Sequence, residues 1–175
     1  MKKSHLIIAA CALAQFPSTF QQAFAGSEEV CKISCVAPYP MDAESIKVIA
    51  VIENITKALA DRDYERMKQY MDDGCTTYDE NTKRTVVGRD AIVADVKSKI
   101  AADELKYKAP LLAYKIDRPF VKVNGDTAVV CFVLIKELGG DHPQSFESHC
   151  TDVFVKHGED WKKLNFRGEM WKRAR

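Results

Sequence analysis

Apolar residues in the first half of the chain recur every three or four positions, which is the spacing of amphipathic helices. The clearest such segment is residues 43–60, and Asp42 before it is a suitable N-cap. Its apolar positions are Val48, Ile52, Ile55 and Leu59. The spacing returns in residues 64–71 and again after Gly88. We therefore predict three helices, each with one buried face.

After Pro110 the apolar positions alternate with polar ones, as they do in half-buried strands. The alternating segments are residues 111–123, 127–138, 145–156 and 161–171. Asn124-Gly125 between the first two is a tight hairpin signal. Two shorter β-prone runs flank a polar turn at residues 79–82. Helices followed by consecutive strands predict an α+β fold in which a curved antiparallel sheet wraps around the N-terminal helices.

The last two long strands are expected to pair with Lys156 opposite Trp161, so that even positions of one share a face with odd positions of the next. One predicted face mixes polar and apolar residues, namely Ser148, Cys150, Asp152, Phe154, Asn165, Arg167, Glu169 and Trp171. The other is apolar and holds Val130, Phe132, Leu134, Val153, Val155, Leu164, Phe166 and Met170. Either the apolar face packs on the helices, or the helices cover the mixed face and the apolar face is buried in a dimer.

The predicted pairing of Cys131 with Cys150 depends on the register of the strands as well. With a loop at residues 139–144, Leu138 pairs with Ser145, and Cys131 becomes the diagonal neighbour of Cys150 on one face. A slip of two residues would bring these two thiols within bonding distance. We expect disulfides at Cys131–Cys150 and at Cys31–Cys35, and Cys75 as the free thiol.

The N-terminus has the pattern of a secretory signal peptide. Two lysines precede a short apolar run, and Ala23-Phe24-Ala25 is a suitable cleavage site before Gly26. The apolar run is too short to span a bilayer, which takes about 20 residues. A lipoprotein signal ending at Cys11 is the weaker alternative. We predict a periplasmic or secreted protein with a signal peptide at 1–25, an irregular arm at 26–41 and one domain at 42–175.

The net charge and the absence of several sequence motifs reduce the number of function classes to consider. The chain has 26 basic and 25 acidic side chains, so nothing in its net charge favours nucleic acid or an anionic membrane as a partner. It contains no glycine-rich phosphate loop, no Gly-x-Ser-x-Gly and no His-Glu-x-x-His. The Cys31–Cys35 spacing is a weak metal signal without a second pair. We therefore predict no metal and no cofactor.

Long segments of the chain resemble a known superfamily. "ALADRDYERMKQYMDDGCTTYDENTKRTVVGRDAI" is similar to the first half of nuclear transport factor 2-like proteins of the SnoaL-like branch. "RPFVKVNGDTAVVCFVL" and "TDVFVKHGEDWKKLNFRGEMW" resemble their closing strands, and most of all those of the association domain of calcium/calmodulin-dependent kinase II. The resemblance covers about residues 44–171. It implies a cone-shaped, cystatin-like barrel, a cavity between helices and concave sheet, and a dimer through the convex face.

The resemblance also implies candidate site residues. In the ketosteroid isomerase branch a carboxylate in the strand after the second helix is the proton-shuttling base, and Asp79 lies there. A protonated acid in the penultimate long strand donates to the oxyanion, and Asp152 lies there. The tyrosine of the first helix is replaced by Ile55. From the residues alone, Asp79 is either a turn residue or a pocket acid.

Arg167 changes the expectation for Asp152. An adjacent guanidinium would lower the pKa of Asp152 and keep the carboxylate ionised. An ionised Asp–Arg pair is better suited to binding a polar or anionic ligand than to donating a proton. We take Tyr78, Asp152, Asn165, Arg167 and Glu169 as the candidate ligand-binding residues.

Two functions follow from these expectations. The first is an exported, non-catalytic binding or assembly domain, a homodimer through Phe132, Val153, Val155, Leu164 and Phe166, with a small polar or anionic ligand in its pocket. The alternative is a SnoaL-like isomerase, cyclase or dehydratase that uses Asp79 as base and Asp152 or a tyrosine as oxyanion donor.

Overall fold

A computed structural model describes residues 41–169 and 171–173 of the chain. The helices are α1 (Ala43–Ala60), α2 (Tyr64–Gln69) and α3 (Arg89–Tyr107). Asp42 caps α1 by accepting the Ser45 N–H at 2.7 Å, and Gly88 enters α3 with a φ of 89° that favours glycine. The three predicted helices are confirmed. The second ends earlier than expected because Met71 already belongs to the first strand.

The strands form one sheet in the order β2-β1-β6-β5-β4-β3, with β7 beside β5. Their bounds are β1 (Met71–Asp79), β2 (Arg84–Val87), β3 (Leu111–Asn124), β4 (Thr127–Leu138), β5 (Gln144–His157), β6 (Asp160–Gly168) and β7 (Lys172–Arg173). β1 runs parallel to β6, whereas the other pairs are antiparallel. The α+β prediction is confirmed, but the sheet is mixed and not purely antiparallel.

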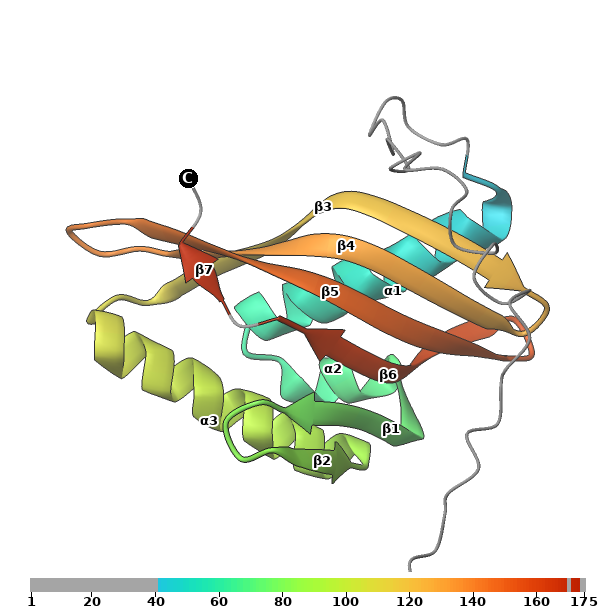
Figure 1. Ribbon diagram of the computed structural model, residues 1–175, viewed down its shortest axis with the longest axis horizontal. Helices are drawn as coiled ribbons and strands as arrows, with labels where there is room; N and C mark the ends of the chain where they lie inside the picture. The colour runs from blue at the N-terminus through green and yellow to red at the C-terminus, as the bar shows by residue number, and fades with distance from the viewer. Residues whose placement is uncertain (1–40, 170, 174–175) are drawn as a thin grey trace, which may run out of the picture. The chain divides into compact units, whose positions relative to one another are not determined.

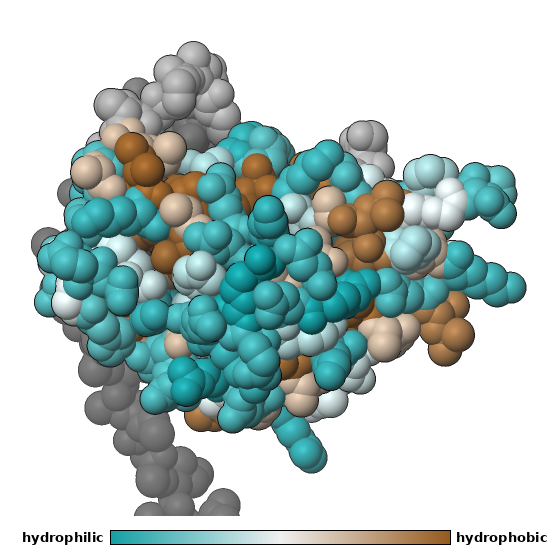
Figure 2. Space-filling model, turned by 180° about the vertical axis from the view of Figure 1, so that it is seen from behind, coloured by the Kyte–Doolittle hydropathy of each residue, from teal (hydrophilic) through white to brown (hydrophobic). Residues whose placement is uncertain are grey.

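The helices cover one face of the sheet. Figure 1 shows α1 crossing behind β3, β4 and β5, and α3 beside β1 and β2. Val48 and Ile52 of α1 pack with Val130 and Phe154 in one core cluster, and a second cluster joins α2 and α3 to β1 and the start of β3. Figure 2 shows the side on which α1 lies, where hydrophilic side chains cover most of the surface and hydrophobic ones form separate groups. The core thus lies between the helices and the sheet.

Two local features change the predicted register. Leu138 pairs with Gln144, one residue earlier than expected, because the β4–β5 loop is shorter by one residue. In β6, Lys163 pairs with Phe154 but Asn165 pairs with Val153, so Leu164 forms a bulge. A shift of one residue moves every later side chain to the other face of a sheet.

The helix-covered face therefore differs from both predicted faces. It combines members of the two sets, namely Val130, Phe132, Ser148, Asp152, Phe154 and Phe166, and it also holds Lys163. The opposite, outer face holds Val129, Cys131, Thr151, Val153, Val155, Asn165 and Arg167. Phe132 and Phe166 are thus wrongly placed in the predicted dimer face, since both pack in the core.

Candidate functional site

A buried ion pair lies at the centre of the helix-covered face. Asp152 on β5 is 2% exposed, and Lys163 on β6 places its Nζ 2.6 Å from Asp152 Oδ2. The contact lacks hydrogen-bond geometry, so the carboxylate is neutralised mainly by the nearby charge. The ammonium also lies over the rings of Phe154 and Phe166, at 5.8 and 5.1 Å from their centroids. Lys163, not Arg167 as predicted, is the partner of Asp152.

The buried surroundings of this pair raise the pKa of three titratable groups. Burial raises the pKa of Asp152, and the charge of Lys163 opposes that effect. Burial, with the nearby Asp152 charge, raises the pKa of Cys75 and of Cys150 to about 11. Both thiols therefore stay protonated at neutral pH, and neither has the thiolate character of a nucleophile.

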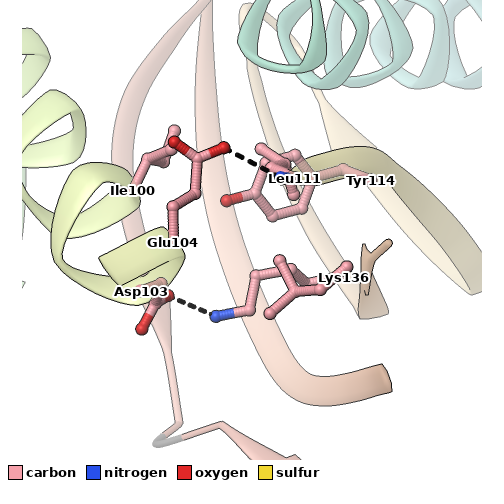
Figure 3. Close-up of a pocket in the computed structure, with 7 residues that line it drawn as sticks. Ile100, Asp103, Glu104, Leu111, Tyr114 and Lys136 are labelled. Carbon is pink, nitrogen blue, oxygen red and sulfur yellow. Dashed lines mark hydrogen bonds and ion pairs between the residues drawn. The ribbon is translucent and has the colours of Figure 1, made fainter. Parts of the chain in front are cut away.

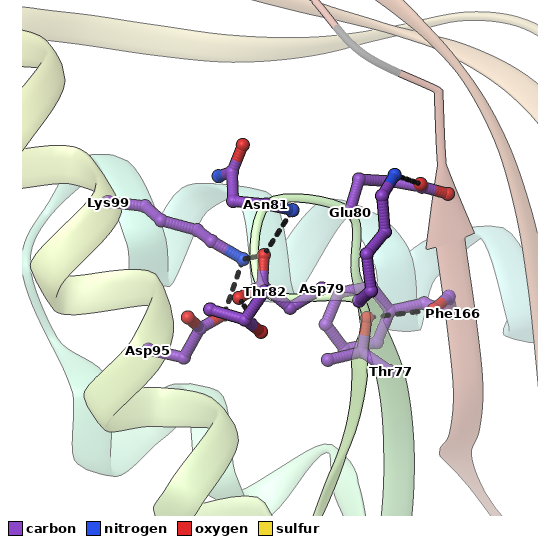
Figure 4. Close-up of polar contacts among 9 residues, drawn as sticks. Thr77, Asp79, Glu80, Asn81, Thr82, Asp95, Lys99 and Phe166 are labelled. Atoms are coloured by element: carbon purple, nitrogen blue, oxygen red, sulfur yellow. Dashed lines mark hydrogen bonds and ion pairs between the residues drawn. The ribbon is translucent and has the colours of Figure 1, made fainter.

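Asp79 is the last residue of β1, directly before the turn to β2, and is 5% exposed. Figure 4 shows its carboxylate facing three donors. It accepts the Thr82 hydroxyl at 2.6 Å and the Asn81 N–H at 3.1 Å, and Lys99 Nζ lies 3.1 Å away. These contacts, led by that with Thr82, lower the pKa of Asp79 to about 2, so the carboxylate is a weak base at neutral pH.

The other predicted site residues lie on the outer face or beyond the end of β6. Arg167 contacts Glu80 Oε1 at 3.0 Å and lies over the Tyr78 ring at 5.4 Å. Asn165 donates to Thr76 Oγ1 at 2.7 Å, and the Glu169 side chain pairs with Lys172. The sheet therefore separates Tyr78, Asn165 and Arg167 from Asp152, so the predicted ligand-binding set does not form one pocket.

The described cysteines, Cys75, Cys131 and Cys150, are free. Cys131 is opposite Thr151 on the outer face, whereas Cys150 is opposite Phe132 on the helix-covered face. The predicted Cys131–Cys150 disulfide is therefore wrong, because the sheet lies between the two side chains. The predicted Cys31–Cys35 pair lies outside the described residues.

This arrangement predicts unequal thiol reactivity in the folded protein. Cys131 is exposed in the single chain, and in dilute, monomeric protein we expect a maleimide to modify it at least about a hundredfold faster than Cys75 or Cys150, which are shielded and protonated. Timed labelling followed by peptide mass spectrometry measures each site separately. Labelling of the unfolded chain, where the three thiols should react alike, is the control. Equal rates in the folded chain would contradict the assigned faces.

A second polar group lies near the end of the same face. Lys136 on β4 is 3% exposed, and its Nζ lies 2.5 Å from Asp103 Oδ2 of α3. The ammonium is 4.4 Å from the Trp171 ring centroid and 5.2 Å from that of Phe146. Figure 3 shows Asp103 and Lys136 beside Glu104 and Tyr114 at a small hollow.

The sequence analysis missed both buried lysines. For Lys136 a signal existed, since it has the same parity as Val130, Phe132 and Leu134 and so belongs to the buried side of its strand. For Lys163 a signal existed as well, since the predicted pairing of Lys156 with Trp161 places Lys163 opposite Phe154 and on the face of Asp152, as the structure shows. Within the described residues, no cluster of three or more His, Cys, Asp or Glu side chains suits a metal ion. In the same part of the chain, no helix has the length and apolar character needed to cross a membrane.

The family model for the SnoaL-like domain matches residues 48–165. The chain belongs to the SnoaL-like family. This confirms the resemblance drawn from the sequence, and the described sheet and helices have the fold of solved nuclear transport factor 2-like proteins. No curated protein gives a significant match to this SnoaL-like chain.

Solved structures of similar fold come from several organisms. The hub homology domain of CaMKII from Chlamydomonas reinhardtii has 20% identity and a TM-score of 0.60, over 76% of this chain and 100% of that one. A putative calcium/calmodulin-dependent protein kinase II association domain from Xanthomonas campestris has 18% identity and a TM-score of 0.58, over 75% and 91%. Aln2 from a Streptomyces species has 13% identity and a TM-score of 0.64, over 75% and 94%. At these identities the likeness shows the fold.

Proposed function

We propose that this SnoaL-like domain is an exported, non-catalytic binding or assembly domain that forms a homodimer through the outer face of its sheet. The observation that carries the proposal is a group of valines on that face, which also carries polar residues such as Thr151 and Arg167. Val129 is 39% exposed, and Val153 and Val155 are half-buried in the single chain. Apolar groups gathered on one face of a sheet are stabilised when a second copy covers them.

The chemistry of the two candidate acids favours binding over catalysis. Asp79 is held by Thr82, Asn81 and Lys99 with a pKa of about 2, and Asp152 faces Lys163. A SnoaL-like isomerase or lyase would need one of them as a base near neutral pH or as a neutral donor. The likeness to domains described as hub or association domains supports an assembly role as well.

Substitution of Val129 by aspartate tests the proposed dimer. The buried carboxylate would be unpaired in the interface, so we expect the variant to sediment as a monomer while the unchanged protein sediments as a dimer at micromolar concentration. Leu105→Asp is the matched control, because Leu105 is 81% exposed on α3, away from the outer face, and should leave the dimer intact. A monomeric unchanged protein would contradict the proposal.

A further inference from the structure

His149 is an exposed side chain near the centre of the outer face. It belongs to β5, an inner strand of the sheet with β4 on one side and β6 on the other (Figure 1). Each of the 12 residues of β4 is paired with a residue of β5, and Val133, the seventh of them, is paired with His149. The preceding Ser148 faces the helices, so the side chain of His149 points to the outer side. It therefore lies in the middle of the surface through which we propose that two copies associate.

The β4 residues around His149 are apolar. Val133 lies directly opposite, and Cys131 and Ile135, on either side of Val133 on the same face, are the diagonal neighbours. Val133 is 7% exposed and Ile135 is half-buried. A second copy on the outer face would enclose the imidazole ring of His149 among these groups. A charged ring is disfavoured in such surroundings, whereas a neutral ring is tolerated.

The charged groups around His149 do not reverse this expectation. They are Glu147 of β5, Glu137 of β4, Lys115 and Asp117 of β3, Arg167 of β6 and Glu169 just after β6. In the described part of the chain, all of them except Glu147 form ion pairs with other side chains. Glu147 lies two residues from His149 on the same strand and face, so it attracts a protonated ring in the single chain and in the dimer alike. The difference between the two states therefore depends on the enclosure of the ring.

We propose that His149 makes the homodimer sensitive to pH, so that the two copies separate when this residue is protonated. The inference rests on the proposed homodimer. Two identical surfaces meet about a two-fold axis, and residues near the centre of the surface come close to their own copies. Protonation would place two like charges in an apolar contact, where they repel each other. The dimer then binds fewer protons than the separated chains, so a fall in pH favours separation.

Sedimentation of the purified protein over a range of concentrations, at about pH 7.5 and about pH 5.5, tests the inference, because histidine gains its proton in this interval. We expect the dissociation constant of the dimer to rise about a hundredfold at the lower pH, since each of the two histidines contributes about tenfold. A dimer that is equally tight or tighter at the lower pH would overturn the role of His149 and leave the homodimer standing. A monomer at both pH values would contradict the homodimer itself, and the inference with it.

Two glutamine variants assign the response to one residue. His149→Gln keeps a polar side chain that cannot be charged, so its dissociation constant should change by less than about threefold between the two pH values. His157→Gln is the matched control, because His157 lies at the end of the same strand and its ring nitrogen contacts Asp72 Oδ2 at 2.8 Å. This control should keep the hundredfold response. A response that persists in His149→Gln, or that disappears in His157→Gln, would overturn the assignment to His149.

Discussion

Replacement of Lys163 by methionine is expected to lower the free energy of unfolding by about 3–5 kcal/mol, because it leaves the Asp152 carboxylate buried without its partner. Methionine is close to lysine in length and apolar, so little packing is lost. Urea denaturation of the purified protein measures the change. The Asp152–Lys163 contact is the most deeply buried ion pair in the described part of the chain.

The adjacent lysine provides the control for this experiment. Lys162 points to the other side of β6 and donates to the Gln69 carbonyl at an exposed position. Lys162→Met should therefore lower the free energy of unfolding by less than about 1 kcal/mol. Equal losses in the two variants would show that Asp152 is not buried beside Lys163 as described.

The free energy of unfolding of the Lys163→Met variant should also change with pH in a defined direction. Burial raises the pKa of Asp152, and without Lys163 nothing nearby opposes that effect. The folded chain then holds the proton at pH values where the unfolded chain has released it. The contribution of Asp152 to the stability of the variant is therefore most favourable below the ordinary carboxyl pKa of 3.8 and is lost as the pH rises above it, in contrast to the unchanged protein.

Replacement of Phe154 by alanine is expected to lower the free energy of unfolding by about 3–5 kcal/mol, because it opens a cavity in the core. Phe154 is 0% exposed and packs with Val48 and Ile52 of α1 and with Trp161. The Lys163 ammonium would also lose the ring beneath it. Urea or thermal unfolding measures the loss.

The same substitution on the edge strand is the control for the core variant. Phe120 on β3 is 52% exposed, and Phe120→Ala should change the free energy of unfolding by less than about 1 kcal/mol. A loss at Phe154 no larger than the loss at Phe120 would contradict the packing of α1 against the sheet.

Some features of the site could be predicted from the sequence, and others could not. Asp79 was left between a turn role and a pocket role, and its contacts with Asn81 and Thr82 are those of a turn residue. Asp152 was singled out as a candidate, and the structure places it in a buried ion pair, but Lys163 was not named as its partner. Arg167 was taken as that partner, and the bulge at Leu164, which has no reliable signature in a single sequence, moves Arg167 to the outer face.

The sequence by itself determined the elements and the family of this protein. Asp42 and Gly88 mark helix starts, Asn124-Gly125 marks a hairpin, and the apolar spacing separates helices from strands, because each signal acts within a few residues of the chain. Only the tertiary structure decided which side chains face the helices. A β4–β5 loop one residue shorter than expected and one bulged leucine exchanged the faces of Cys131, Phe132 and Phe166, because strand side chains alternate with a period of two. The bulge also moves Arg167 to the outer face, and Lys163 is then the basic partner of Asp152 on the helix-covered face.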